Sequence, residues 1–169
     1  MRRHRFATTL VSLAVIAGAA GLTLSTTPSM VSADSAGNAD VTFTKWVTSA
    51  KTLPWDMAGV VGGDAGPGAF AGEVLSSDMI ANGTINVIHA HYHINGGTRQ
   101  LTADLLVIEN EQTNTAVSNG IVTDGWMEGA RVQGEYTVMS ACPIATPHNV
   151  LGTVCFQGSL HIVPGPAGT

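Results

Sequence analysis

The sequence predicts an all-β protein: a single small antiparallel β-barrel of about eight strands, with a β-sandwich as the alternative fold. The chain is rich in Gly, Thr, Val, Asn and Ser, and only 11% of its residues are charged, a composition that favours strands and turns over exposed helices. Short apolar segments alternate with turn signals at regular intervals, which is typical of sandwiches and barrels. No segment keeps a helical hydrophobic period.

Each expected strand is a short apolar or alternating segment that ends at a turn signal. Turn signals include Asn82-Gly83, Asn95-Gly96-Gly97 and Asp124-Gly125. The expected strands cover residues 41–48, 56–62, 69–76, 84–94, 98–109, 116–123, 130–140 and 153–163.

The N-terminal segment has the features of a secretory signal peptide. Arg2, Arg3 and Arg5 precede an apolar stretch over 11–24, and small residues follow at 31–33. Glycines dilute the apolar stretch below the ~20 residues that a membrane anchor needs, so we expect cleavage after Ala33 and secretion. The expected organisation is a signal peptide at 1–33, a flexible mature N-terminus at 34–40, the β-barrel domain at 41–164 and a frayed C-terminus at 165–169.

The charge of the mature chain limits its partners. After residue 33 the sequence holds four basic and twelve acidic residues, a net charge of −8 with neutral histidines. This balance argues against a nucleic-acid partner. No later segment is long and apolar enough for a membrane-spanning helix.

The two cysteines predict a disulfide. Cys142 and Cys155 are separated by twelve residues, which excludes a C-x-x-C redox or zinc motif, and in an oxidising compartment such a pair usually forms a disulfide. The alternative is two buried thiols. The intervening loop contains Pro143 and Pro147 and needs a tether, so we expect a Cα separation of roughly 4.4 to 6.8 Å.

A glycine pattern recurs along the chain and favours the barrel. Residues 70–74, 132–136 and 156–160 share the order apolar, variable, Gly, polar, apolar. Each glycine lies on the same face as its apolar neighbours, where it is unfavourable unless the strand bends or approaches another backbone closely. Closing a curved sheet requires such positions.

The same strands, the Gly-rich hairpins and the terminal segment 152–160 resemble the allene oxide cyclase and dirigent type of barrel. The resemblance implies an eight-stranded calycin-like barrel whose cavity binds or shapes apolar small molecules. None of that family's catalytic residues can be matched to positions in this chain, so the resemblance implies the fold more than an activity.

Three histidines share one face of a predicted strand. His89, His91 and His93 alternate with Ala90 and Tyr92, and alternate residues of a strand point the same way. A two-residue turn at Asn95-Gly96 separates polar from apolar positions. That turn would place His93 opposite Thr98, His91 opposite Gln100, His89 opposite Thr102 and Ala90 opposite Leu101. The polar histidine face is then either the outer surface or the wall of a hydrated cavity.

A divalent metal is the only cofactor that these residues suggest. Because His89 and His93 lie about 13 Å apart at ~3.3 Å per residue, a site would combine His89 and His91 with a residue from another strand, for which Asp104 or His161 is available. The opening of the cupin metal motif, G-x5-H-x-H, also fits Gly83 to His91. The rest of that motif fails, because Asn95 replaces the acidic ligand and His148 lies in the wrong setting.

Other candidate residues carry weaker signals. Glu73 and Glu135 occupy corresponding positions in the glycine pattern and could form a carboxylate pair. Trp46, Trp55 and Trp126 could line a ligand pocket, although tryptophan usually covers a core.

Three functions remain open from the sequence. The first is a secreted module that binds an apolar small molecule or a surface glycan without catalysis. The second is an enzyme of the cyclase or isomerase kind that uses a barrel cavity, and the third is metal binding through the histidine strand. An enclosed cavity with a polar residue would keep the enzyme hypothesis, whereas a fully packed interior would remove it.

Overall fold

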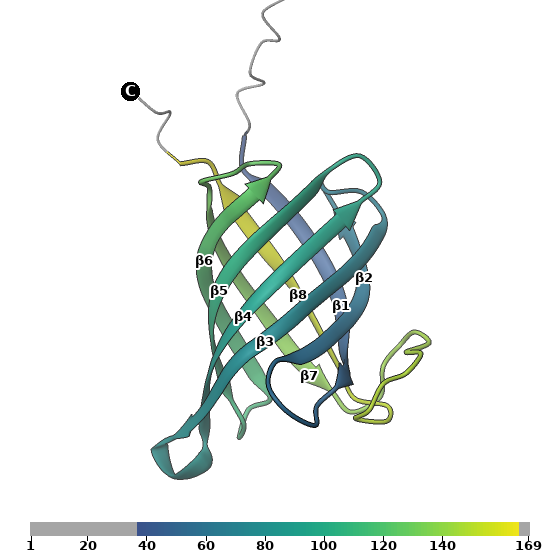
Figure 1. Ribbon diagram of the computed structural model, residues 1–169, viewed down its shortest axis with the longest axis vertical. Helices are drawn as coiled ribbons and strands as arrows, with labels where there is room; N and C mark the ends of the chain where they lie inside the picture. Colours follow the sequence, from purple (N-terminus) through teal and green to yellow (C-terminus); the bar gives the residue numbers. More distant parts are fainter. Residues whose placement is uncertain (1–36, 166–169) are drawn as a thin grey trace, which may run out of the picture. The chain divides into compact units, whose positions relative to one another are not determined.

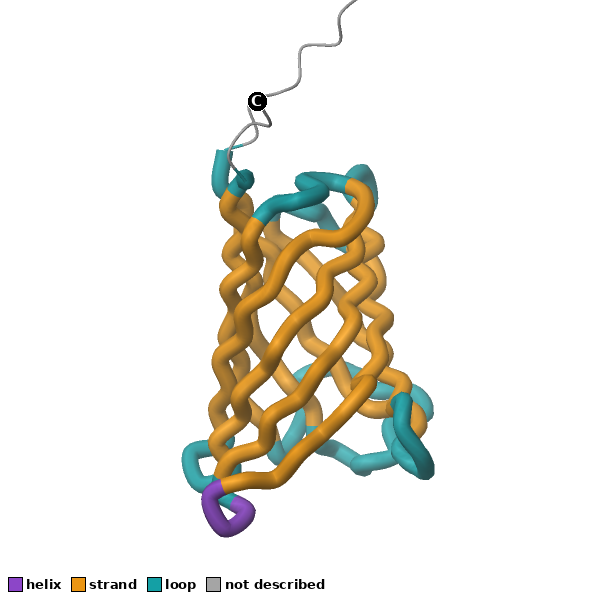
Figure 2. The backbone as a smooth tube through the Cα atoms, turned by 60° about the vertical axis from the view of Figure 1, so that its left-hand side comes forward, coloured by secondary structure: helices purple, strands orange, loops and turns teal. Residues whose placement is uncertain are grey.

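The computed structural model describes residues 37–165, in which eight antiparallel strands close into a barrel. Each strand pairs with the next one along the chain, and β1 also pairs with β8 (Figure 1). Figure 2 shows the barrel from another side. The strands are β1 Ala39–Ser49, β2 Trp55–Gly63, β3 Gly68–Ile80, β4 Ile85–Gly96, β5 Gln100–Asn110, β6 Thr115–Gly125, β7 Arg131–Met139 and β8 Cys155–Val163. The predicted barrel is therefore confirmed over the sandwich.

All eight predicted strands form, with small differences at their ends. β1 begins at Ala39, two residues before the predicted start of the barrel domain, and a short 3-10 turn over Ala81–Gly83 joins β3 to β4. The predicted signal peptide at 1–33, its cleavage after Ala33 and most of the predicted frayed C-terminus lie outside the described residues. Within 37–165 no helix is long and apolar enough to cross a membrane.

Alternation along each strand sends apolar side chains inward, and these fill one half of the barrel. In the half that contains the β4–β5 and β6–β7 turns, residues such as Val41, Ile94 and Leu160 are almost completely buried. Phe70 and Tyr92 pack edge to face near the middle, with ring centroids 4.9 Å apart. The other half is more open and holds the site described below.

Two glycines of the recurring pattern allow strands to approach each other. A Cβ on Gly134 would lie 2.7 Å from Leu160 Cδ2, and one on Gly158 would lie 2.7 Å from Tyr136 Cβ. Neither position has room for a side chain without displacing a buried neighbour. The close approach expected from the pattern is therefore present on strands β7 and β8.

The predicted turn at Asn95-Gly96 is wrong. β4 continues through Gly96, whose N–H donates to the Arg99 carbonyl over 2.9 Å, so the turn residues are Gly97 and Thr98. Gly96 stays in the strand because it also pairs with Gly68 of β3. Every partner on β5 consequently moves by four residues: His93 faces Thr102, His91 faces Asp104, His89 faces Leu106 and Ala90 faces Leu105. Because side chains of a strand alternate between the two faces of the sheet, a shift of four residues leaves each side chain on its inner or outer face.

The predicted disulfide between Cys142 and Cys155 is confirmed, with a Cα separation of 5.4 Å. It tethers the loop over residues 140–154 between β7 and β8. The loop folds back on β1: Trp46 Nε1 donates to the Pro147 carbonyl over 3.0 Å, and the Val150 N–H donates to the Val47 carbonyl over 2.9 Å. The loop thereby covers Trp46, whose side chain faces outward from β1 and is nevertheless buried.

Candidate functional site

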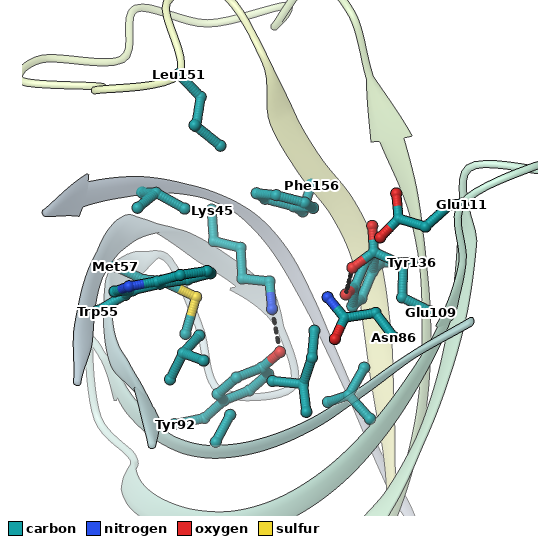
Figure 3. A pocket seen from close by; sticks show the side chains of 15 residues that line it. Lys45, Trp55, Met57, Asn86, Tyr92, Glu109, Glu111, Tyr136, Leu151 and Phe156 are labelled. Carbon is teal, nitrogen blue, oxygen red and sulfur yellow. Dashed lines mark hydrogen bonds between the residues drawn. The ribbon is translucent and has the colours of Figure 1, made fainter. Parts of the chain in front are cut away.

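The open half of the barrel holds a cavity of about 190 Å³ at the end where β1 joins β2 and β7 joins β8. Aliphatic side chains and Met57 form much of its wall, and Trp55 and Phe156 add aromatic surface. Leu151, from the disulfide-tethered loop, also lines the cavity and lies at its edge in Figure 3. The volume is below the ~300–1,000 Å³ of pockets for drug-sized ligands, so the cavity fits a small or slender molecule.

Lys45 is a buried basic side chain that lines this cavity. It follows Val41 and Phe43 on the inner face of β1 and is only 3% exposed. Its Nζ donates a hydrogen bond to the Tyr92 hydroxyl, as drawn in Figure 3. Aromatic rings surround Nζ, with centroids at 4.2 Å for Tyr92, 4.6 Å for Tyr136, 5.4 Å for Phe43, 5.7 Å for Phe156 and 5.9 Å for Phe70.

Burial changes the protonation of Lys45. Desolvation lowers the pKa of its amine from 10.5 to about 7, and the negative charge of Glu109 opposes part of this effect. Near neutral pH the amine therefore exists in both its ammonium and its neutral form. The neutral form is a base and a nucleophile.

Glu109 is the second buried ionisable group of the cavity. It continues the inward-facing row of Leu105 and Val107 on β5, is 7% exposed, and accepts a hydrogen bond from the Tyr136 hydroxyl over 2.9 Å. Burial raises the pKa of Glu109, while the hydrogen bond from Tyr136 acts in the opposite direction. Burial also raises the pKa of both Tyr92 and Tyr136, so the two phenols keep their protons. The Tyr136 hydroxyl donates to Glu109, whereas the Tyr92 hydroxyl accepts from Lys45.

Two hydrogen-bonded pairs, Lys45 with Tyr92 and Glu109 with Tyr136, thus face a largely apolar cavity, whose lining also includes Asn86 and Glu111. A few polar groups within an apolar concave wall are the usual composition of a small-molecule site. An amine with a lowered pKa beside a carboxyl with a raised pKa is also a pattern found at catalytic sites. The arrangement can bind a polar group at the inner end of an apolar molecule and can exchange protons with it.

The histidine strand presents its histidines on the outer surface of the barrel, where His89 and His91 border an open hollow together with Asp104. His89 and His93 are exposed, and His91 is partly exposed. His91 Nε2 lies 3.0 Å from Asp104 Oδ1. Among the described residues that oxygen has no hydrogen-bond partner, so the two side chains are close neighbours without an aligned hydrogen bond between them.

The structure brings together only part of the predicted metal site. His91 and Asp104 are neighbours, whereas His89 faces Leu106. His161, the other candidate ligand, is paired with Asp40 at 2.7 Å. Within residues 37–165 no group of three or more His, Cys, Asp or Glu side chains is arranged to hold a metal ion.

The other candidate residues are separated from one another. Glu73 on β3 and Glu135 on β7 face outward from strands on opposite sides of the closed sheet, so they do not form a carboxylate pair. Trp126 lies outside the cavity lining, and the Arg99 guanidinium stacks 4.3 Å from its ring centroid. Of the three tryptophans only Trp55 lines the cavity.

The sequence reasoning missed the four buried polar residues of the cavity, Lys45, Tyr92, Glu109 and Tyr136, although the sequence contained a signal for them. Lys45 and Glu109 both continue an alternating apolar row of their strand. A charged residue at such a position must point into the barrel if the alternation holds. Tyr92 and Tyr136 follow the same rule on β4 and β7.

Comparisons of the chain with protein-family models, with curated proteins and with solved structures found no match. The resemblance to allene oxide cyclase and dirigent barrels therefore stays a prediction, while the eight-stranded barrel itself is shown by the structure.

Proposed function

We propose that this chain is a secreted binding protein for a small, largely apolar molecule with one polar end. The observation that supports this proposal is the half-open barrel: one end of the interior is packed, while the other leaves a cavity of about 190 Å³ with Lys45 inside it. A barrel built only for stability would be filled by side chains throughout.

The cavity wall favours an apolar molecule over a glycan. A glycan presents hydroxyl groups on all sides, and most of them would lose their hydrogen bonds against Val47, Met57 and Ile88. An apolar chain would instead bury its surface there, and its polar end would reach Lys45 or Glu109. Each buried methylene contributes about 0.8 kcal/mol, or roughly a fourfold gain in affinity.

Calorimetry with a series of straight-chain primary alcohols tests the proposal. Affinity should rise by roughly fourfold for each added methylene and then stop rising when the chain fills the cavity. Fluorescence from Trp55, which lines the cavity, should change over the same concentration range.

A matched pair of variants locates the binding. Ala90→Leu adds volume to the cavity wall, whereas Ala71→Leu makes the same change on the exposed outer face of the neighbouring strand β3. Only Ala90→Leu should weaken alcohol binding. Equal affinities in both variants, or no binding by the unmodified protein, would contradict the proposal.

A second candidate is an enzyme of the cyclase or isomerase kind. It is favoured by the opposite pKa displacements of Lys45 and Glu109, which place a base and an acid in one water-poor cavity. The two candidates differ in the fate of the ligand: a binding protein releases it unchanged, whereas an enzyme releases a rearranged isomer of the same mass. Chromatography of ligand recovered from the unmodified protein and from Glu109→Gln distinguishes them.

A further inference from the structure

Lys45 is one of only two lysines in the chain, and the two have contrasting surroundings. Lys51 is exposed in the connection between β1 and β2. Lys45 is buried and lines the cavity, where Figure 3 shows its amine directed toward Tyr92 between the cavity walls. Any apolar molecule that enters the cavity meets a primary amine at its inner end.

We infer that Lys45 is a reactive amine that binds aldehydes or ketones covalently as an imine, with the apolar part of the ligand in the cavity. This inference rests on the proposed binding function and names the ligand class. A carbonyl compound with an apolar chain matches the cavity, because its carbon atoms suit the wall and its carbonyl carbon is the atom that a primary amine attacks.

The hydrogen bond to Tyr92 holds the amine in a suitable orientation. A neutral amine can donate one N–H to the Tyr92 hydroxyl and still keep its lone pair free for attack. Burial favours this neutral form, since it lowers the pKa of Lys45 to about 7. An exposed amine such as that of Lys51 lacks both the hydrogen bond to a buried phenol and the apolar cavity.

The surroundings also suit the positively charged product. The five rings around Nζ lie within 4.2 to 5.9 Å, a range in which cation–π attraction stabilises a cationic nitrogen. A protonated imine carries its charge on the same nitrogen. Glu109 provides the negative charge that already favours protonation at this position.

The reaction is a condensation that releases one water. The lone pair of the Lys45 amine forms a bond with the carbonyl carbon, and a proton passes from nitrogen to the carbonyl oxygen, which gives a carbinolamine. The C–O bond then breaks, the hydroxyl leaves as water with one added proton, and the C=N bond forms. Glu109, whose pKa is raised by burial, is the buried carboxyl of the cavity and can supply and recover this proton.

Trapping with hexanal and sodium cyanoborohydride tests the inference, because cyanoborohydride reduces a protonated imine to a stable secondary amine. At pH 7 an amine with a pKa of about 7 is half neutral, whereas an ordinary lysine amine is neutral in only about one molecule in 2,500. Weaker basicity lowers nucleophilicity and offsets part of this advantage. We therefore expect peptide mapping to show at least about tenfold faster labelling of Lys45 than of Lys51.

Two variants and one competitor identify the site. Lys45→Met should lose the fast labelling, and Lys51→Arg should keep it with Lys45 as the sole lysine. Excess 1-hexanol, which has no carbonyl group, should slow labelling of Lys45 and leave Lys51 unaffected. If 1-hexanol binds by calorimetry but Lys45 is labelled no faster than Lys51, the inference is overturned while the proposed binding function stands.

Discussion

Replacing Lys45 by methionine should make the protein more stable at neutral pH, and this gain should shrink as the pH rises. Methionine has a similar length and is apolar, so it fits the surroundings of the buried lysine. It removes a group whose charged form is destabilised by burial. Replacing a buried ionised residue with an apolar one of similar volume is often neutral or stabilising.

The magnitude follows from the pKa of Lys45. Its pKa is 10.5 in an unperturbed lysine and about 7 in the folded protein, which corresponds to about 5 kcal/mol at 1.36 kcal/mol per pH unit. The variant also leaves the Tyr92 hydroxyl without its donor, a loss of about 1–3 kcal/mol. The expected net stabilisation at pH 7 is therefore about 2–4 kcal/mol.

The pH dependence has a definite sign. Between pH 7 and 10.5 the unfolded chain binds a proton at Lys45 that the folded chain does not bind. Lys45 therefore destabilises the folded protein most near pH 7. This destabilisation decreases by up to about 1.4 kcal/mol per pH unit as the pH rises toward 10.5. Below pH 7 both states are protonated and the full destabilisation remains.

Urea denaturation from pH 6 to 9.5 measures this contribution, with Lys51→Met as the control for loss of an exposed lysine. The difference in free energy of unfolding between the unmodified protein and Lys45→Met should narrow steadily above pH 7. Parallel curves for the two proteins would refute the reasoning, because they would show that Lys45 has the same protonation in the folded and unfolded states.

The remaining predictions concern the second polar pair, the strand glycines and the tethered loop. Tyr136→Phe removes the donor to Glu109 and should lower stability by about 1–3 kcal/mol at neutral pH. The loss should be smaller in acid, where the carboxyl is protonated in both states. Gly158→Ala should lower stability by about 1–3 kcal/mol through overpacking, as measured by urea denaturation. Cys142→Ser should lower stability by about 3 kcal/mol, and mass spectrometry of the unmodified protein should find no alkylatable thiol without reduction.

Each of these predictions has a control or a contrary outcome. Equal losses for Tyr136→Phe at pH 4 and pH 8 would show that the Glu109 charge is not involved. Gly37→Ala, where a Cβ would meet no atom within 4 Å, should change stability little. Reductant should destabilise the unmodified protein but leave Cys142→Ser unchanged. The metal prediction is tested by calorimetry of tag-free protein with Zn²⁺, Cu²⁺ and Ni²⁺, where a His89→Ala, His91→Ala double variant should lose any binding that these side chains provide.

The strands and their inner faces could be predicted because both depend on local pattern. Alternation along β4 assigned Ala90 and Tyr92 to one face and His91 to the other, and both assignments hold. The turn could not be chosen the same way, because moving it by two residues leaves every face unchanged. Pairing of Gly96 with Gly68 on the adjacent strand β3 decides between the two turns, and that contact depends on the folded sheet.

The site was harder to predict because it depends on which part of the interior stays empty. The alternation places Lys45 and Glu109 inside the barrel, but a sequence does not show whether side chains from the facing strands fill the space around them. The burial of Trp46 shows the same limit. Its position on β1 predicts an outward side chain, and only the folded loop that brings Pro147 against it explains why it is buried.

The energetics of the two halves of the barrel support a functional origin for the buried polar pairs. The packed half, with residues such as Leu160 and Ile162 fully enclosed, provides apolar burial without ionisable groups of this kind. In the open half, desolvation of Lys45 and Glu109 opposes folding. The empty cavity also lacks the van der Waals contacts that larger side chains would make there. Local departures of this kind from what stability favours are expected at functional sites. If Lys45→Met is more stable and yet fails to form the hexanal adduct, the role of the lysine is to bind the ligand and not to stabilise the fold.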